Sequence, residues 1–361
     1  MSSSRNSLIN STIAIFLIFS FCKKGQTAGD FLKIGIGSKN IAMGDTGATF
    51  SDVNSIYWNP AGLGLIQKKE ICFMHQKHFQ DIYYNYSGFA YPDKFGTLAI
   101  GLYYLNIADF QGYDEEGNKT KKINSYDFSS TIGYSKNFLN SRLSIGAGIK
   151  YIQEKLEKKY AETFSFDFGT IYYIPLEYGN LRTGLSIQNI YGKMKFFDEP
   201  SSIPEILRFG IGFEPNSNQT YKFDFVTEFS VFNRENSNFN LGLQFNIKNL
   251  IFLRAGYVFL MENSGLRAGI GIKISDFIFD YAYSPYGELG DSHRFSITLK
   301  FGKTDYEKKL QIEKCYQNGL KLYEEKKYPE AIFEFNKILE IDPSNSDALQ
   351  MLRKCNENLK D

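Results

Sequence analysis

The sequence predicts a mainly β protein: a transmembrane antiparallel β-barrel of about fourteen strands with an N-terminal hatch and a small C-terminal all-α repeat module. From about residue 70 to residue 301, apolar and polar residues alternate with a period of two. Aromatic residues make up 16% of the chain, with 33 Phe and 25 Tyr, which suits a wall that faces lipid and has aromatic rims. An apolar leader at the N-terminus indicates export.

Residues 1–28 are interpreted as a signal peptide. Arg5 lies in a short polar region, and Ile13–Phe21 is an apolar run that is shorter than the roughly 18 residues needed to span a bilayer as a helix. Cleavage after Ala28 and lipidation at Cys22 both remain open, although the bulky Phe21 precedes that cysteine where a small residue is expected. The leader favours a bacterial outer-membrane location.

The barrel is expected over residues 70–302, and Ser141–Tyr151 illustrates its pattern. Leu143, Ile145 and Ile149 point one way, while Gly146 and Lys150 point the other. Fourteen such runs occur, an even number as expected of a bacterial barrel, at about 70–76, 82–91, 95–106, 124–137, 141–154, 160–174, 179–190, 205–214, 220–232, 237–247, 250–260, 264–274, 275–284 and 291–301.

The connections between these runs predict the orientation. Short turns are expected at 92–95, 139–141, 175–179 and 248–250, and longer polar links at 108–122, 191–204 and 284–290. Short turns belong on the periplasmic side and long loops outside. A soluble β-sandwich also alternates, but its inward face would need the bulk to fill a core. Here the polar face is rich in Gly and tolerates Arg and Lys, which favours a lumen.

Residues 29–69 do not alternate, and they are rich in glycine. Such an irregular segment before a barrel is most simply folded into the lumen as a hatch, because lipid cannot solvate irregular backbone. The candidate hatch motif is Asn59, Pro60, Ala61 and Gly62. Pro60 would fix a turn and Asn59 could bond backbone groups. The block could equally do no more than close the barrel.

The segments Gly29–Leu32, Ala42–Gly44, Asp52–Asn54 and Tyr57–Leu63 resemble the N-terminus of the PorV/PorQ family. That family is similar to the FadL-type outer-membrane transporters of long-chain fatty acids, which are hatched barrels. The resemblance covers about 29–301 and implies passive transport of hydrophobic or amphipathic small molecules. PorV and PorQ are instead associated with protein secretion and surface attachment, so a scaffold function is the alternative that the same resemblance implies.

Residues 303–361 change to helical periodicity and match one tetratricopeptide-like repeat. The matching positions are Gly319, Leu322, Tyr328, Ala331, Phe335 and Pro343. A single repeat buries its own face poorly, so this module is expected to dock, either on the barrel's periplasmic rim or on a periplasmic protein. Cys315 and Cys355 lie in its helices, where a disulfide and two small buried residues are both open.

The sequence predicts no catalytic residues, no metal site and no cofactor, and hence no enzyme. His75, His78 and Asp81 could be drawn as a metal site, but their spacing suits a helix and they lie near the end of a strand. The net charge of +1 gives no basic field for nucleic acid. The lumen-facing candidates that could contact an acyl carboxylate, pair with one another or anchor the hatch are Lys150, Arg182, Arg208, Lys222, Arg254, Arg267 and Lys273.

Overall fold

The computed structural model describes residues 28–77, 82–114, 116–196, 199–217, 220–233, 236–259, 264–286 and 290–359. The chain divides into two compact units, one ending at Lys300 and the other beginning at Phe301. The predicted signal peptide, including Cys22, lies outside the described residues except for Ala28. Among the described residues, no helix is both long enough and apolar enough to cross a membrane.

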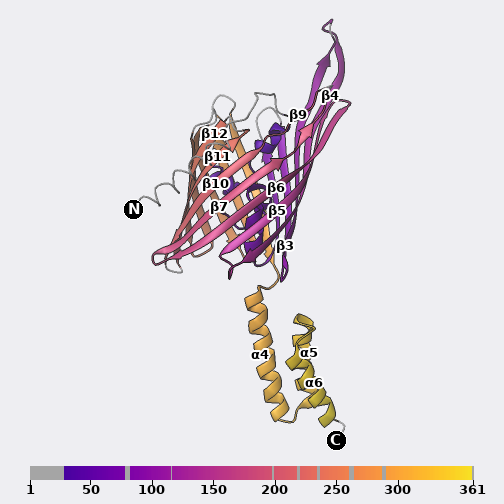
Figure 1. Ribbon diagram of the computed structural model, residues 1–361, viewed down its shortest axis with the longest axis vertical. Coiled ribbons are helices and arrows are strands. Elements are labelled where there is room, and N and C mark those ends of the chain that lie inside the picture. Colours follow the sequence, from indigo (N-terminus) through magenta and orange to yellow (C-terminus); the bar gives the residue numbers. More distant parts are fainter. Residues whose placement is uncertain are drawn as a thin grey trace, which may run out of the picture. The chain divides into compact units, whose positions relative to one another are not determined.

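The first unit is a closed antiparallel barrel, and its described residues form fourteen wall strands (Figure 1). Each strand pairs with its sequence neighbours, and the first strand lies beside the last, which closes the wall. The strands are β1 (Lys69–Lys77), β2 (Ile82–Asp93), β3 (Gly96–Tyr113), β4 (Lys119–Phe138), β5 (Leu143–Leu156), β6 (Lys159–Leu176), β7 (Gly179–Ile190), β10 (Ile206–Pro215), β11 (Tyr221–Phe232), β12 (Asn236–Ile247), β13 (Ile251–Phe259), β14 (Gly265–Ile274), β15 (Phe277–Pro285) and β16 (Asp291–Phe301). The predicted fold class is confirmed.

The two faces of the wall differ as the alternation predicts. On β5, Ile145 and Ile149 are exposed on the outside, whereas Ser144 and Lys150 are buried on the inside. Exposed Phe, Leu, Ile and Tyr side chains continue around the outer face of every wall strand from β3 to β16. A continuous apolar surface of this kind is unfavourable in water, and it identifies a wall that spans a membrane.

The prediction of a long polar loop at 108–122 is wrong. Instead, β3 continues to Tyr113 and β4 begins at Lys119, so the two strands form a hairpin that extends beyond their neighbours (Figure 1). Register shifts interrupt the pairing after Ile107 and after Gln111. The alternation is lost there because both faces of a hairpin that projects past the wall meet water, so neither face has to be apolar.

The two ends of the barrel are distinguished by their connections. At the turn end, β4 joins β5 through Leu139 and Asn140, and β12 joins β13 through Lys248 and Asn249, all with positive φ. At the loop end, several connections are longer, although only Glu157 and Lys158 join β5 to β6. The connection between β7 and β10 carries an additional pair of short strands, β8 (Lys193–Met194) and β9 (Ser201–Ser202). The chain enters β1 and leaves β16 at the turn end.

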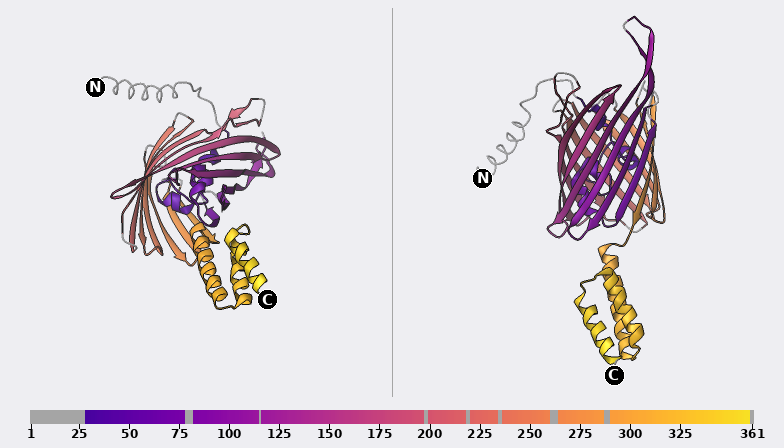
Figure 2. Two further views of the ribbon diagram at one scale, coloured as in Figure 1. Left: turned by 60° about the horizontal axis from the view of Figure 1, so that its bottom comes forward. Right: turned by 90° about the vertical axis from the view of Figure 1, so that its right-hand side faces the viewer.

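Residues 28–68, which we call the inner segment, fold inside the barrel (Figure 2). They form four short helices: η1 (Asp30–Lys33), α2 (Ser38–Ala42), α3 (Ser55–Trp58) and η2 (Pro60–Leu65). The short helix α2 lies against β13, β14 and β15, and η2 lies against β4, β5 and β6. The inner segment therefore crosses the lumen and contacts the wall on opposite sides.

The second unit consists of α4 (Asp305–Glu324), α5 (Tyr328–Ile341) and α6 (Ser346–Asn358). Thr304 and Glu307 form a capping box at the start of α4, and Asn345 caps α6 through Ala348 N–H at 3.0 Å. The core of the unit contains Cys315, Ala331, Phe335, Ile338, Ala348, Met351 and Cys355.

The residues matched to the predicted repeat occupy distinct places in this unit. Gly319 has no room for a side chain because the Phe335 ring packs on it. Leu322 and Tyr328 are half-buried against the core, and Pro343 is exposed just after α5 ends. Both thiols are free and buried, and burial raises the pKa of Cys315 and of Cys355 above the usual value of a thiol.

Phe335→Ala should unfold the helical unit. Truncating a buried Phe costs about 3–5 kcal/mol, which is a large part of the stability of so small a core. We expect Cys355 to be alkylated rapidly at neutral pH in the variant and slowly in wild type. Peptide mass spectrometry measures the rate of alkylation. Phe333→Ala is the matched control, because Phe333 is 64% exposed. Equal alkylation rates in the two variants would show that Phe335 is not a core residue.

Candidate functional site

The candidate site is the contact between the inner segment and the inward face of the wall. At its centre, Asn59 is fully buried and caps η2. Its Oδ1 accepts from Ala61 N–H at 3.1 Å, and its Nδ2 donates to the carbonyls of Ala48 at 2.7 Å and Thr170 at 3.1 Å. One side chain thus fixes two stretches of the inner segment and joins them to β6.

The residues that follow Asn59 continue this attachment. Pro60 occupies the first position of η2, where its missing N–H has no cost. The carbonyl of Ala61 accepts from Ser135 Oγ at 3.1 Å and from Ser144 Oγ at 2.6 Å. A side chain at Gly62 would collide with Phe50 and Ser55. The motif predicted from the sequence therefore lies at a wall contact on β4, β5 and β6.

Glycines of the wall allow the backbones to approach this closely. A Cβ at Gly169 would collide with Asn59, and one at Gly146 would collide with Pro60. On the other side of the lumen, Gly242 and Gly256 face Met43 and Gly44 in the same way. The glycine-rich inward face is thus the complement of the inner segment.

A second attachment is a clamp made by Arg208, Glu228 and Gln188. Glu228 accepts from the N–H groups of Gly47 at 2.7 Å and Ala48 at 2.8 Å, and Gln188 donates to the carbonyls of Tyr57 and Trp58.

Arg208 joins these two wall residues. Its Nη1 donates to Glu228 Oε1 at 3.0 Å and its Nε to Gln188 Oε1 at 3.1 Å. Its guanidinium lies 4.6 Å from the centroid of the Trp58 ring. The clamp therefore holds two stretches of the inner segment against β7, β10 and β11.

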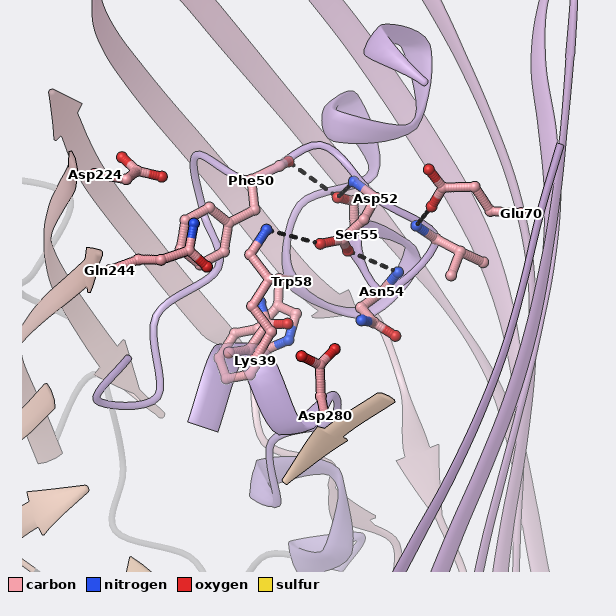
Figure 3. A network of polar contacts seen from close by, with 12 residues as sticks. Lys39, Phe50, Asp52, Asn54, Ser55, Trp58, Glu70, Asp224, Gln244 and Asp280 are labelled. Carbon is pink, nitrogen blue, oxygen red and sulfur yellow. Dashed lines mark hydrogen bonds and ion pairs between the residues drawn. The ribbon is translucent and has the colours of Figure 1, made fainter. Parts of the chain in front are cut away.

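A third attachment lies where the barrel closes. Lys300 on β16 contacts Glu70 on β1 at 2.6 Å, and Glu70 also accepts from Val53 N–H at 3.0 Å. Figure 3 shows the bond from Val53 N–H to Glu70 together with Lys39, which pairs with Asp52 at 3.1 Å. Asp224, Gln244 and Asp280 of the wall lie around Lys39 in the same view. The inner segment is thus bonded to the first strand of the wall, which is itself paired to the last.

The predicted lumen-facing cations fall into two groups. Five are buried: Lys150, Arg182, Arg208, Arg254 and Arg267. Four of these five contact a carboxylate of the wall, and Arg267 contacts Asp45 of the inner segment at 3.7 Å. Lys222 and Lys273 lie at the turn end, where Lys222 is exposed and Lys273 half-buried, so these two are not part of the interior network.

The contacts of several site residues escaped sequence reasoning, including those of Gln188, Ser135, Ser144, Ser186 and Arg294. The alternation places all of them on the inward face, but nothing in it indicates which group each one meets. His75 lies on the outward face and contacts Asn85 at 2.8 Å, while His78 and Asp81 lie outside the described residues. Within the described residues, no group of three or more His, Cys, Asp or Glu is placed to hold a metal.

No protein-family model matches the chain. Its sequence is 22% identical over 338 residues to the UPF0164 protein of Treponema pallidum (strain Nichols), covering 87% of this chain and 79% of that protein. Among solved structures, it is similar to the deltaS2S3 mutant of the monoaromatic hydrocarbon channel TodX, with 12% identity, a TM-score of 0.46, and coverage of 75% of this chain and 99% of that chain. A Pseudomonas aeruginosa FadL homologue gives 12% identity, a TM-score of 0.41, and coverage of 77% and 98%. None of these similarities identifies a family.

Asn59→Ala should destabilise the barrel. The change leaves the carbonyl of Ala48 and the N–H of Ala61 without this partner in a buried site, which costs about 1–3 kcal/mol. We expect the variant to unfold at a lower urea concentration than wild type. The heat-modifiable mobility of the barrel in gels measures the folded fraction. Asn216→Ala, an exposed turn residue that donates to Glu177 O at 2.7 Å, is the control and should change the midpoint little. If both variants unfold at the same urea concentration, Asn59 does not hold the inner segment.

Proposed function

We propose that the protein is an outer-membrane transporter of hydrophobic or amphipathic small molecules, of the long-chain fatty acid class, which diffuse through a barrel that the inner segment closes. The observation that supports this best is a difference between two sectors of the inward face. On β1, β2 and β3, many of the inward side chains are apolar or aromatic, among them Met74, Tyr84, Tyr86, Tyr103 and Leu105, although Glu70 and Gln76 of β1 are polar. A pore for water-soluble solutes would have no use for such a lining.

The opposite sector supports an amphipathic cargo. Strands β7, β10, β11 and β13 to β15 carry charges that form buried ion pairs, and several of these charges retain contact with water. The side chains of Asp224 and Arg182 are 14% and 10% exposed, and Lys39 of the inner segment, paired with Asp52, is 24% exposed. The inner segment covers the apolar sector in this state. Once the inner segment moves aside, a molecule with a polar group and an apolar body would meet both surfaces within one lumen.

The inner segment would serve as the hatch of this transporter, with Asn59, Pro60, Ala61 and Gly62 at one attachment and the clamp at another. In this proposal the turn end faces the periplasm and the helical unit lies there, because short turns are typical of the periplasmic side. The protein carries out no chemical step, so we expect neither a cofactor nor catalytic residues.

Glu228→Gln should loosen the hatch. The amide cannot pair ionically with Arg208, and one of its two atoms is a donor, so the N–H groups of Gly47 and Ala48 are held less well. In planar bilayers we expect longer and more frequent openings than in wild type. Deletion of residues 28–68 should give a larger and steadier conductance. Glu177→Gln, in an exposed turn, should behave as wild type. A wild-type protein that is steadily open would contradict a closing hatch.

The transport itself is tested by uptake of labelled dodecanoate in cells that lack the protein. We expect slower uptake than in the parent strain, restored by the wild-type chain. Uptake that is unchanged by the loss of the protein would exclude the proposed cargo.

The alternative is a PorV-like scaffold for secretion or envelope assembly, in which the tetratricopeptide-like unit binds a periplasmic protein. One observation favours it: Phe333 and Leu310 of the helical unit are 64% and 58% exposed. Ending the chain after Gly302 separates the two functions, because a transporter should keep its uptake while a scaffold should lose its partner. If a photocrosslinker at Phe333 yields no protein adduct in cells, the scaffold function is excluded at this surface.

A further inference from the structure

The buried cations on the wall are, with one exception among the described residues, paired with carboxylates. Lys150 contacts Asp167 at 2.9 Å, Arg208 contacts Glu228 at 3.0 Å and Arg254 contacts Asp280 at 2.6 Å. Arg182 pairs with Asp224, and Arg267 with Asp45. This is expected, because a charge taken out of water is strongly unfavourable unless an opposite charge compensates it.

Arg294 is the exception. It lies on the inward face of β16, opposite Ala282 of β15, and is 1% exposed. Its Nε donates to Gln76 Oε1 at 2.7 Å and its Nη2 to the Tyr286 hydroxyl at 3.1 Å, so both of these partners are neutral. Its Nη1 has no partner within the described part of the chain. Among the residues that the structure describes, this fully buried guanidinium therefore has neither a counter-charge nor an acceptor for Nη1.

Ser284 is a second unfilled donor at the same place. It lies on β15, opposite Ser292, and its side chain is fully buried with no partner for Oγ among the described residues. Since the register pairs Ala282 with Arg294 and Ser284 with Ser292, Ser284 and Arg294 are diagonal neighbours on one face. Ser292 is already occupied, because its Oγ accepts from Gln76 Nε2 at 2.8 Å.

A second guanidinium lies close to this place. The guanidinium of Arg267 lies 5.4 Å from the centroid of the Tyr286 ring, whose hydroxyl contacts Arg294. Two buried guanidinium groups thus flank one neutral phenol at the loop end of β14, β15 and β16. Asp45, 3.7 Å from Arg267, is 26% exposed and lies on the inner segment. A cation would be repelled here, and a neutral group would leave the charge of Arg294 uncompensated.

We propose that Arg294 and Ser284 form a binding site for a single oxyanion group, the carboxylate or phosphate of a molecule that enters from the loop end. A guanidinium binds such a group through two parallel N–H bonds, and Nη1 is available for the first. The second comes from Nη2 when the anion replaces the Tyr286 hydroxyl, and Ser284 Oγ donates a third. That the molecule is an amphiphile rests on the proposed function; that it is an anion rests on Arg294 and Ser284 alone.

The test is calorimetric titration of the purified full chain in a neutral maltoside detergent, with dodecanoate, dodecanol and inorganic phosphate as probes. We expect wild type to bind dodecanoate, and Arg294→Gln to weaken that binding at least tenfold while leaving dodecanol unchanged. Arg294→Lys should retain part of the affinity because it keeps the charge, and Ser284→Ala should weaken binding several-fold. Arg142→Gln, in an exposed turn, is the matched control and should bind as wild type. Heat-modifiable mobility establishes that each variant is folded.

The outcomes separate the sources of the anion and the two proposals. Phosphate binding that depends on Arg294 indicates a free oxyanion site, and dependence for dodecanoate alone indicates a headgroup site; both support the inference. If folded Arg294→Gln binds dodecanoate as wild type does, or if wild type binds neither anion, the inference is overturned. If the oxyanion site is overturned but dodecanol uptake still requires the protein, the proposed transport function remains supported. Conversely, Arg294-dependent binding without any uptake would overturn the transporter and leave the oxyanion site intact.

Discussion

Hydrogen bonds from the wall to the backbone of the inner segment are the interaction on which the rest of the interior depends. The carbonyl of Ala61 is satisfied by two serines, that of Trp58 by Ser186, and that of Asp45 by Asn240. The inner segment has only short helices, so several of its backbone carbonyls and N–H groups find their partners on the wall instead. Each group left unpaired in the buried interior would cost about 1–3 kcal/mol. The wall therefore supplies hydrogen-bond partners at the positions along the barrel axis where these backbone groups lie. This requirement determines which inward residues must be polar.

The same requirement explains why small residues and charges alternate along the inward face. Where the inner segment approaches closely, as at Gly169 and Gly242, the wall has no side chain at all. Where it stands further away, long side chains such as Arg208 and Gln188 reach across the gap. Burial then forces the charges into pairs, because the interior solvates an isolated ion poorly. The polar lining is thus fitted to one particular path of the inner segment.

Strand number, strand position and the direction of each side chain could be predicted from the sequence, because lipid outside and a polar interior impose a period of two. The partner of each inward residue could not. The alternation places Gln188 and Arg294 on the inward face. Which group each one contacts depends on the positions along the barrel axis of residues that are far apart in the chain, and the alternation carries no information about those positions. The hairpin beyond Ile107 was missed for a different reason. Water lies on both of its faces, so its residues do not alternate between apolar and polar. The role of Asn59 could be predicted because a helix cap and the proline that follows it are local features of the sequence.

The apolar sector of the inward face, on β1, β2 and β3, contacts the inner segment by packing as well as by hydrogen bonds. On β1, β2 and β3, residues such as Met74, Tyr84 and Tyr103 point inward and pack against Tyr57, Ile56 and their neighbours. The same strands also hydrogen-bond the inner segment: the Tyr86 hydroxyl donates to Val53 O at 3.2 Å, and Glu70 accepts from Val53 N–H at 3.0 Å. Packing is non-directional and tolerates small shifts, whereas hydrogen bonds depend on geometry. A tyrosine such as Tyr86 makes both kinds of contact, because its ring packs in the core while its hydroxyl fixes one backbone carbonyl.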